Sequence, residues 1–83
     1  MIYQYKTSGT CSRMISLIIE DDIINDVKFM GGCDGNLKGI SALVKGMHID
    51  SAIEKLSGIR CGFKTTSCPD QLAKALMQYK AQR

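Results

Sequence analysis

The first third of the chain alternates apolar and polar residues, which is the pattern of strands with one buried face. The run IYQYKT at residues 2–7 alternates, and RMISLIIE at residues 13–20 is rich in β-branched and apolar residues. DVKFMGG at residues 26–32 resumes the alternation, after acids and Asn25 that suit a turn. We therefore expect three antiparallel strands in a small meander.

The remainder of the chain repeats apolar residues at helical spacing. The repeat occurs in residues 35–46, 48–58 and 68–80. In the first of these stretches the apolar stripe consists of Leu37, Ile40, Leu43 and Val44. Strands followed by helices predict an α+β fold, with a three-stranded antiparallel sheet and about three helices packed on one face. We expect residues 1–83 to form a single domain.

Local signals suggest where the first two helices begin and end. Asn36 and Asp50 suit helix N-termini, and Gly46 and Gly58 suit helix C-termini. His48, the only histidine, precedes the second helix and is expected to be an exposed loop residue.

Size and charge narrow the classes of function. A chain of 83 residues has a small core and often needs a metal, disulfides or a second subunit for stability. The net charge of +3 is mild and no basic stripe is interleaved with aromatics, so we expect no nucleic-acid binding. No signal peptide or membrane-spanning stretch is visible, which predicts a cytoplasmic protein without membrane association. In that compartment, clustered cysteines indicate metal or redox chemistry more often than stable disulfides.

The four cysteines all fall at the ends of expected elements. Cys11 precedes the second strand, Cys33 follows the third, Cys61 lies before the last helix and Cys68 begins it. Pro69 suits the first helical position, which would make Cys68 the N-cap or a close neighbour of it. Helix N-termini stabilise thiolate over thiol, so we expect reactive or metal-binding sulfur at Cys33 and Cys68.

The spacing of these cysteines leaves the alternatives open. No C-x-x-C motif is present, so a metal or redox cluster would have to assemble through the fold. The competing interpretation is that the cysteines are unconnected, buried small hydrophobic residues. Asp34 and Asp70 follow two of the cysteines, either as groups near a metal or as acids that complement a helix N-terminus.

The run TSCPDQLAKAL, together with TSGTCS, FMGGCDGNLKGISALVKG and GIRCG, resembles the TSCPD domain family over nearly the whole chain. This family contains small stand-alone proteins and a domain at the C-terminus of adenosylcobalamin-dependent ribonucleotide reductases. The resemblance implies an accessory role in ribonucleotide reduction. The chain is too short to be a complete ribonucleoside-diphosphate reductase, so it would be at most a component of one, and we assign no catalytic residue.

A more distant similarity links the chain to NifU-like iron–sulfur scaffold proteins, which have three antiparallel strands followed by helices. Their three cysteines occupy places that match Cys11, Cys33 and Cys68, which implies that these residues converge at one edge of the sheet. Two departures put cluster transfer in doubt. The scaffold pattern has an aspartate where this chain has Arg13, and a histidine where it has Ser67.

These observations predict a cysteine-cluster module that binds zinc or an iron–sulfur cluster. The ligands would be Cys11, Cys33, Cys61 and Cys68, with four sulfurs suiting either group. The groups around them would be Arg13, Asp34, Ser67 and Asp70. A reductase or a metal-trafficking protein would be the partner, and a homodimer is left open.

Two further functions remain as alternatives. Cys61 and Cys68 could instead form a thiol–disulfide relay for a ribonucleotide reductase. The exposed helix N-termini could bind phosphate or a nucleotide without chemistry, although the usual phosphate-binding motifs are absent. An iron–sulfur scaffold role is the third alternative.

Overall fold

The computed structural model describes residues 2–7, 12–31, 34–60, 62 and 66–82. Its elements are, in chain order, β1 (Ile2–Lys6), β2 (Ser12–Glu20), β3 (Ile23–Gly31), α1 (Asp34–Val44), α2 (Ile49–Leu56) and α3 (Cys68–Gln82). The strands form one antiparallel sheet in the order β1-β2-β3, with β2 in the centre. The predicted α+β arrangement of a three-stranded meander followed by three helices is confirmed.

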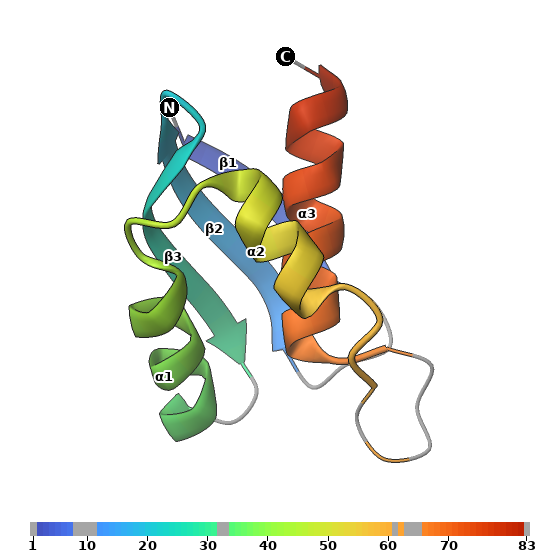
Figure 1. Ribbon diagram of the computed structural model, residues 1–83. Helices are drawn as coiled ribbons and strands as arrows, with labels where there is room; N and C mark the ends of the chain where they lie inside the picture. Colours follow the sequence, from blue (N-terminus) through green and yellow to red (C-terminus); the bar gives the residue numbers. More distant parts are fainter. Residues whose placement is uncertain (1, 8–11, 32–33, 61, 63–65, 83) are drawn as a thin grey trace.

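The helices divide between the face and the edge of the sheet. Figure 1 shows α2 and α3 in front of one face, while α1 lies beside β3. The contacts agree with this view, because α1 packs on β3, α2 packs on α3, and α3 reaches β2. The prediction that helices cover one face therefore holds for α2 and α3, and α1 lines an edge.

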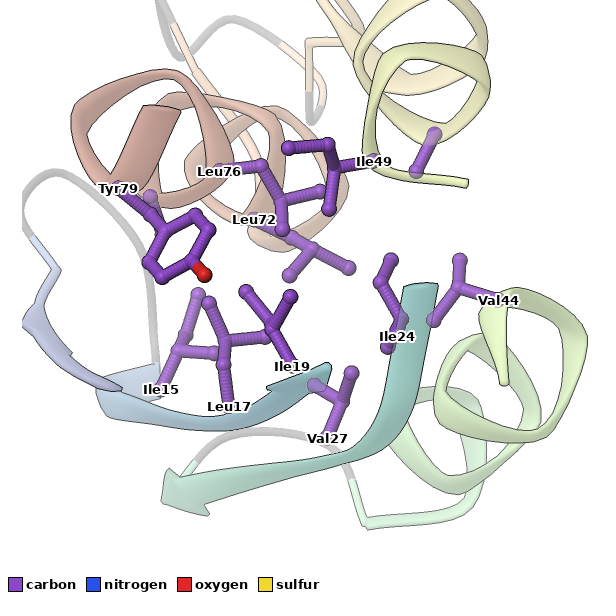
Figure 2. Packing of buried hydrophobic residues seen from close by; sticks show 12 residues of the cluster. Ile15, Leu17, Ile19, Ile24, Val27, Val44, Ile49, Leu72, Leu76 and Tyr79 are labelled. Carbon is purple, nitrogen blue, oxygen red and sulfur yellow. The ribbon is translucent and has the colours of Figure 1, made fainter. Parts of the chain in front are cut away.

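The core forms between the central strand and the last helix. Alternation along β2 sends Ile15, Leu17 and Ile19 to one face, where each is at most 1% exposed. Leu72 and Leu76 of α3 pack over them, as Figure 2 shows. Burial of each such side chain stabilises the fold by roughly 1.5–3 kcal/mol before chain entropy is subtracted. This packing fixes α3, and therefore its first turn, against the sheet.

The β2–β3 connection is tighter than the sequence suggested. The predicted turn included Asn25, but the turn consists of Asp21 and Asp22 alone, with φ of 52° and 62°. Two positive φ values are typical of the type I′ turn that joins two-residue hairpins. Asn25 lies inside β3 instead, as an extra residue between the Ile18–Asp26 and Ile19–Ile24 pairs. This β-bulge lets both Ile24 and Val27 face the core although they are three residues apart.

Helix α1 differs from its prediction in two ways. It begins at Asp34, so Asn36 lies within the helix instead of capping it. Leu43 was placed on the buried stripe but is 77% exposed. The physical reason is that α1 packs mainly against the single strand β3, so a narrow stripe containing Leu37 and Val44 is buried among the described side chains of this helix.

Helix α2 is capped by His48 and not by Asp50. The His48 Nδ1 accepts a hydrogen bond from the Asp50 N–H at 3.1 Å. His48 is exposed, as predicted, but it is the N-cap of the helix and not a residue of an unstructured loop. Gly58 follows the C-terminus of α2 with a φ of 81°, a conformation that favours glycine.

Among the described residues, no helix is long and apolar enough to cross a membrane.

Candidate functional site

The residues immediately before α3 fold into a capped helix start. The Ser67 Oγ accepts a hydrogen bond from the Asp70 N–H at 3.2 Å, and the Ser67 carbonyl accepts one from the Gln71 N–H at 2.8 Å. Ser67 is therefore the N-cap of α3, and Cys68 is its first helical residue. The backbone N–H three residues into the helix is satisfied by a serine hydroxyl.

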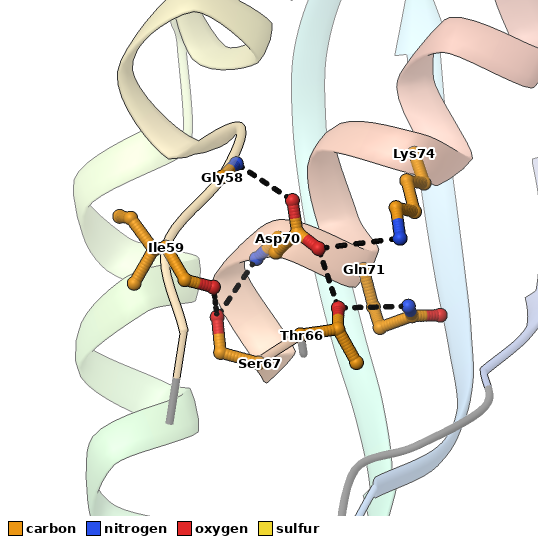
Figure 3. Close-up of polar contacts among 7 residues, drawn as sticks. All are labelled: Gly58, Ile59, Thr66, Ser67, Asp70, Gln71 and Lys74. Atoms are coloured by element: carbon orange, nitrogen blue, oxygen red, sulfur yellow. Dashed lines mark hydrogen bonds and ion pairs between the residues drawn. The ribbon is translucent and has the colours of Figure 1, made fainter. Parts of the chain in front are cut away.

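The Asp70 carboxylate is the centre of a buried hydrogen-bond network, shown in Figure 3. Its Oδ1 accepts a hydrogen bond from the Gly58 N–H at 2.7 Å, and its Oδ2 accepts one from the Thr66 hydroxyl at 2.5 Å. The Lys74 Nζ lies 3.4 Å from Oδ2, one helical turn further along α3. Only 5% of Asp70 is exposed. A single carboxylate thus joins the end of α2 to the start of α3.

Neighbouring side chains extend this network. The Gln71 Nε2 donates to the Thr66 Oγ1 at 3.0 Å, so the Thr66 hydroxyl both accepts and donates. The Ser67 hydroxyl donates to the Ile59 carbonyl at 2.5 Å. Within the described part of the chain, every buried side-chain nitrogen and oxygen atom has a hydrogen-bond partner. Satisfied buried networks of this kind fix one conformation of the segment.

The electrostatics favour a charged Asp70. Burial raises the pKa of this carboxyl, but the hydrogen bonds from Thr66 and Gly58 and the nearby Lys74 outweigh that effect. The net result is that the pKa of Asp70 lies below its ordinary value. Asp70 is therefore a carboxylate at neutral pH, although it is almost fully buried.

Four of the five residues in Thr66–Asp70 have an identifiable structural role at the start of α3. Thr66 and Asp70 bond to each other, Ser67 caps the helix, and Pro69 occupies the first turn, where its missing N–H breaks no helical bond. The pattern Ser-x-x-Asp is a helix-start signal that the sequence contains, and it would have identified Ser67 as the cap. The roles of Ser67 and Asp70 near a metal remain predictions.

The structure describes some of the other candidate residues and not others. Cys68 is half-buried in the first turn of α3. Arg13 is exposed in β2, where it is an extra residue between the Ser12–Gly31 and Met14–Met30 pairs. The predictions for Cys11, Cys33, Cys61 and the side chain of Asp34 lie outside the described residues. Among the described ones, no group of three or more His, Cys, Asp or Glu side chains could hold a metal ion.

The elements that flank the cysteines nevertheless share one end of the fold. Ser12, which follows Cys11, pairs with Gly31, two residues before Cys33. Figure 1 shows the start of β2, the end of β3 and the first turns of α1 and α3 at the lower end of the molecule. The described ends of these four elements thus lie at one end of the fold, and the convergence of Cys11, Cys33 and Cys68 there stays a prediction.

Comparison with known proteins identifies a family and nothing more specific. No curated protein matches the chain, and no solved structure matches it. The family model described as the TSCPD domain matches residues 1–80. This match spans nearly the whole chain, including the Thr66–Asp70 segment that the network holds. The chain belongs to the TSCPD domain family.

Proposed function

We propose that this protein is a metal-binding module in which Cys11, Cys33, Cys61 and Cys68 hold a zinc ion or an iron–sulfur cluster. The observation that carries the proposal is that the start of β2, the end of β3 and the starts of α1 and α3 lie at a common end of the fold (Figure 1). The terminal residues of these elements at that end are Ser12, Gly31, Asp34 and Cys68. Each cysteine is one of these residues or lies within two residues of one, except Cys61.

The residues that precede Cys61 in the sequence are tied to the same end of the fold by the network around Asp70. The Gly58 N–H bonds to Asp70, and the Ile59 carbonyl accepts from the Ser67 hydroxyl. Ile59 is therefore held beside the residue that precedes Cys68. Two residues of chain span at most about 7 Å, so a Cys61 two positions after Ile59 has the reach to share a site with Cys68.

The chemistry of the donors fits the proposed groups. Four cysteine thiolates form the closed tetrahedral set of structural zinc sites, and the same set holds iron–sulfur clusters. We favour zinc, since the aspartate and histidine of the labile scaffold pattern are replaced by Arg13 and Ser67. Bound metal would add folding free energy to a small core.

The association with ribonucleotide reduction is part of this proposal and is supported only by the resemblance within the TSCPD family. In this role the module would bind to a reductase, or to a protein that supplies its metal, and would not carry out the reduction itself. Co-purification with a ribonucleoside-diphosphate reductase of the same cell, lost in the Cys68→Ser variant, would support it.

The decisive experiment is metal and acid-labile sulfide content per chain, on untagged protein purified without air. The proposal predicts one zinc ion, or iron with sulfide, that is lost in Cys11→Ser and Cys68→Ser. Asp70→Asn is the matched control, because it perturbs the start of α3 without removing a thiol. Protein without metal, in which all four thiols titrate, would refute the metal-binding module. A Cys61–Cys68 disulfide forming under mild oxidation would then favour the thiol–disulfide relay.

A further inference from the structure

The two edges of the sheet differ in what covers them. Helix α1 packs on β3 (Figure 1), and the segment that follows α1 bonds to the first part of that strand. The Ile24 N–H donates to the Met47 carbonyl at 2.9 Å, and the Gly46 N–H donates to the Ile24 carbonyl at 2.7 Å. At the other edge, no backbone bond from the described part of the chain reaches the outer side of β1. The edge of β1 is therefore the one at which another strand can extend the sheet.

The register of β1 determines which of its backbone groups face this open edge. The Thr7 N–H donates to the Arg13 carbonyl at 3.2 Å, one step beyond the last pair of the β1–β2 register. In antiparallel pairing, every second residue of an edge strand bonds to its neighbour. The odd-numbered residues of β1 therefore bond to β2. The outward N–H and C=O groups belong to the even-numbered residues, which are Ile2, Gln4 and Lys6.

The side chains of β1 alternate between the two faces of the sheet. Tyr3 and Tyr5 are half-buried and pack against the core cluster. The Tyr3 ring meets that of Tyr79 in α3 edge-on, with 5.7 Å between the ring centroids. Helix α3 packs on the central strand β2, so it lies over the face of the sheet and leaves the edge of β1 open. The even-numbered side chains are exposed, and Ile2 is 69% exposed although it is apolar.

The sequence of β1 is self-complementary when the strand pairs antiparallel with a second copy of itself. A two-fold axis at Gln4 places Gln4 opposite its own copy and Ile2 opposite Lys6 of the second copy, which uses every outward backbone group of the strand. On the other face, this register places Tyr3 opposite Tyr5, and aromatic cross-strand pairs stabilise sheets. The two lysines lie at opposite ends of the paired strands, so no like charges face each other. Other registers either oppose groups that already bond to β2 or leave part of the strand unpaired.

We propose that the edge of β1 is a dimer interface, at which two copies of this chain pair antiparallel through Ile2–Lys6 and form one continuous sheet. Pairing would cover an edge that is otherwise a template for aggregation. It would also supply the second subunit that a core of this size often needs. This interface uses described residues only and is independent of the proposed metal site.

The test is sedimentation equilibrium of the untagged full chain from about 1 μM to 1 mM, with a phosphine reductant to prevent disulfides between chains. We expect a monomer–dimer equilibrium in this range, because one short edge strand buries less area than a standard interface. Amide hydrogen exchange measured by NMR locates the contact. The Gln4 and Lys6 amides should exchange more slowly in the concentrated sample, whereas the Tyr5 amide, which bonds to β2, should be unchanged. A chain that stays monomeric to about 1 mM would overturn the proposal.

A proline at the centre of the strand tests the backbone pairing. Gln4→Pro removes an outward N–H that the sheet of one subunit does not use, and it should weaken dimerisation about tenfold or more. The circular dichroism spectrum should be unchanged, because an edge strand tolerates proline where the N–H faces outward. Gln4→Ala is the matched control, since it shortens the same side chain but keeps the N–H, and it should dimerise as the wild type does.

Charge variants at the same position test the register without altering the backbone. Because Gln4 faces its own copy, Gln4→Lys and Gln4→Glu each place like charges together and should each weaken the dimer severalfold at low salt. An equimolar mixture of the two variants should associate at least as tightly as the wild type, because it pairs opposite charges. A dimer that Gln4→Pro leaves intact, or charge variants that their mixture does not rescue, would overturn the proposal.

Discussion

Asp50 of α2 and Asp70 of α3 both lie in the first turn of a helix, where a carboxylate complements the helix dipole. Their surroundings differ. The Asp50 side chain is 55% exposed and lies 2.6 Å from the Lys80 Nζ. The Asp70 side chain is 7% exposed and bonds to Thr66 and Gly58.

The difference shows how location changes what one residue type does. Water can replace the partners of Asp50, so its contacts contribute little to folding. Water cannot readily reach the partners of Asp70, and loss of that carboxylate would leave the Thr66 hydroxyl, which is buried, without its acceptor. Asp70 also connects residues 12 positions apart, so it fixes the α2–α3 connection, whereas Asp50 mainly joins two helix surfaces.

The largest expected effect is that of Asp70→Ala. We expect it to lower the free energy of unfolding by about 3 kcal/mol, because it removes a buried, charged acceptor from several donors. In a domain of this size the melting temperature would fall by more than about 10 °C. Thermal unfolding of the purified variant, followed by circular dichroism, measures this.

Asp50→Ala is the matched control, since it removes the same side chain from the first turn of a helix. It should cost less than about 1 kcal/mol. Equal losses for the two variants would show that the Asp70 network contributes no more than helix-dipole complementarity.

The same comparison predicts a dependence on pH. Because the pKa of Asp70 is lowered in the folded state, the folded protein binds fewer protons there than the unfolded chain. Its contribution is complete above the unfolded pKa of about 3.9 and is lost as the pH falls through the lower, folded value. Urea unfolding between neutral pH and acid should show wild-type stability approaching that of Asp70→Asn only in acid. A difference between the two that stays constant down to the lowest pH would contradict this.

Capping provides a third, smaller contrast. Ser67→Ala should destabilise the protein by about 1–2 kcal/mol, since it removes the N-cap of α3 and the bond to the Ile59 carbonyl. His48→Ala removes the exposed cap of α2 and should cost less. Denaturant unfolding of both variants gives the two values. If His48→Ala lowered the free energy of unfolding more than Ser67→Ala, the exposure of a capping side chain would not determine how much it stabilises this fold.

These contrasts also indicate what the sequence could and could not predict. The alternation of Ile15, Leu17 and Ile19 and the helical spacing of Leu72 and Leu76 are local patterns, so the order of strands and helices followed from them. The bulge at Asn25 was not predicted. Whether a residue in such a short acidic run forms a turn or a bulge depends on its pairing with the neighbouring strand, which the local sequence does not specify.

The site shows the same limit more strongly. The four cysteines pointed to residues 66–70 as part of a site, but the contacts that organise this segment come from Gly58 and Ile59, which precede it by several positions in the sequence. A pairing between a backbone N–H and a carboxylate 12 positions away leaves no periodic signal. The Ser-x-x-Asp capping pattern, in contrast, can be recognised in the sequence, because its two residues are only three positions apart.

The smallest expected effect concerns the Lys80–Asp50 ion pair. The Lys80 Nζ donates to the Asp50 Oδ1 at 2.6 Å, and both side chains are about half exposed. Exposed pairs of this kind contribute between about 0.2 and 1 kcal/mol, and salt screens them. A double-mutant cycle with Lys80→Ala and Asp50→Ala should give a coupling energy in this range that diminishes in 1 M salt. The equivalent cycle with Lys74→Ala and Asp70→Asn should keep more of its coupling at high salt, because one partner is buried. If salt removed both coupling energies equally, the ion pair of Asp70 would be as open to solvent as that of Asp50. The two aspartates would then differ only in their hydrogen bonds.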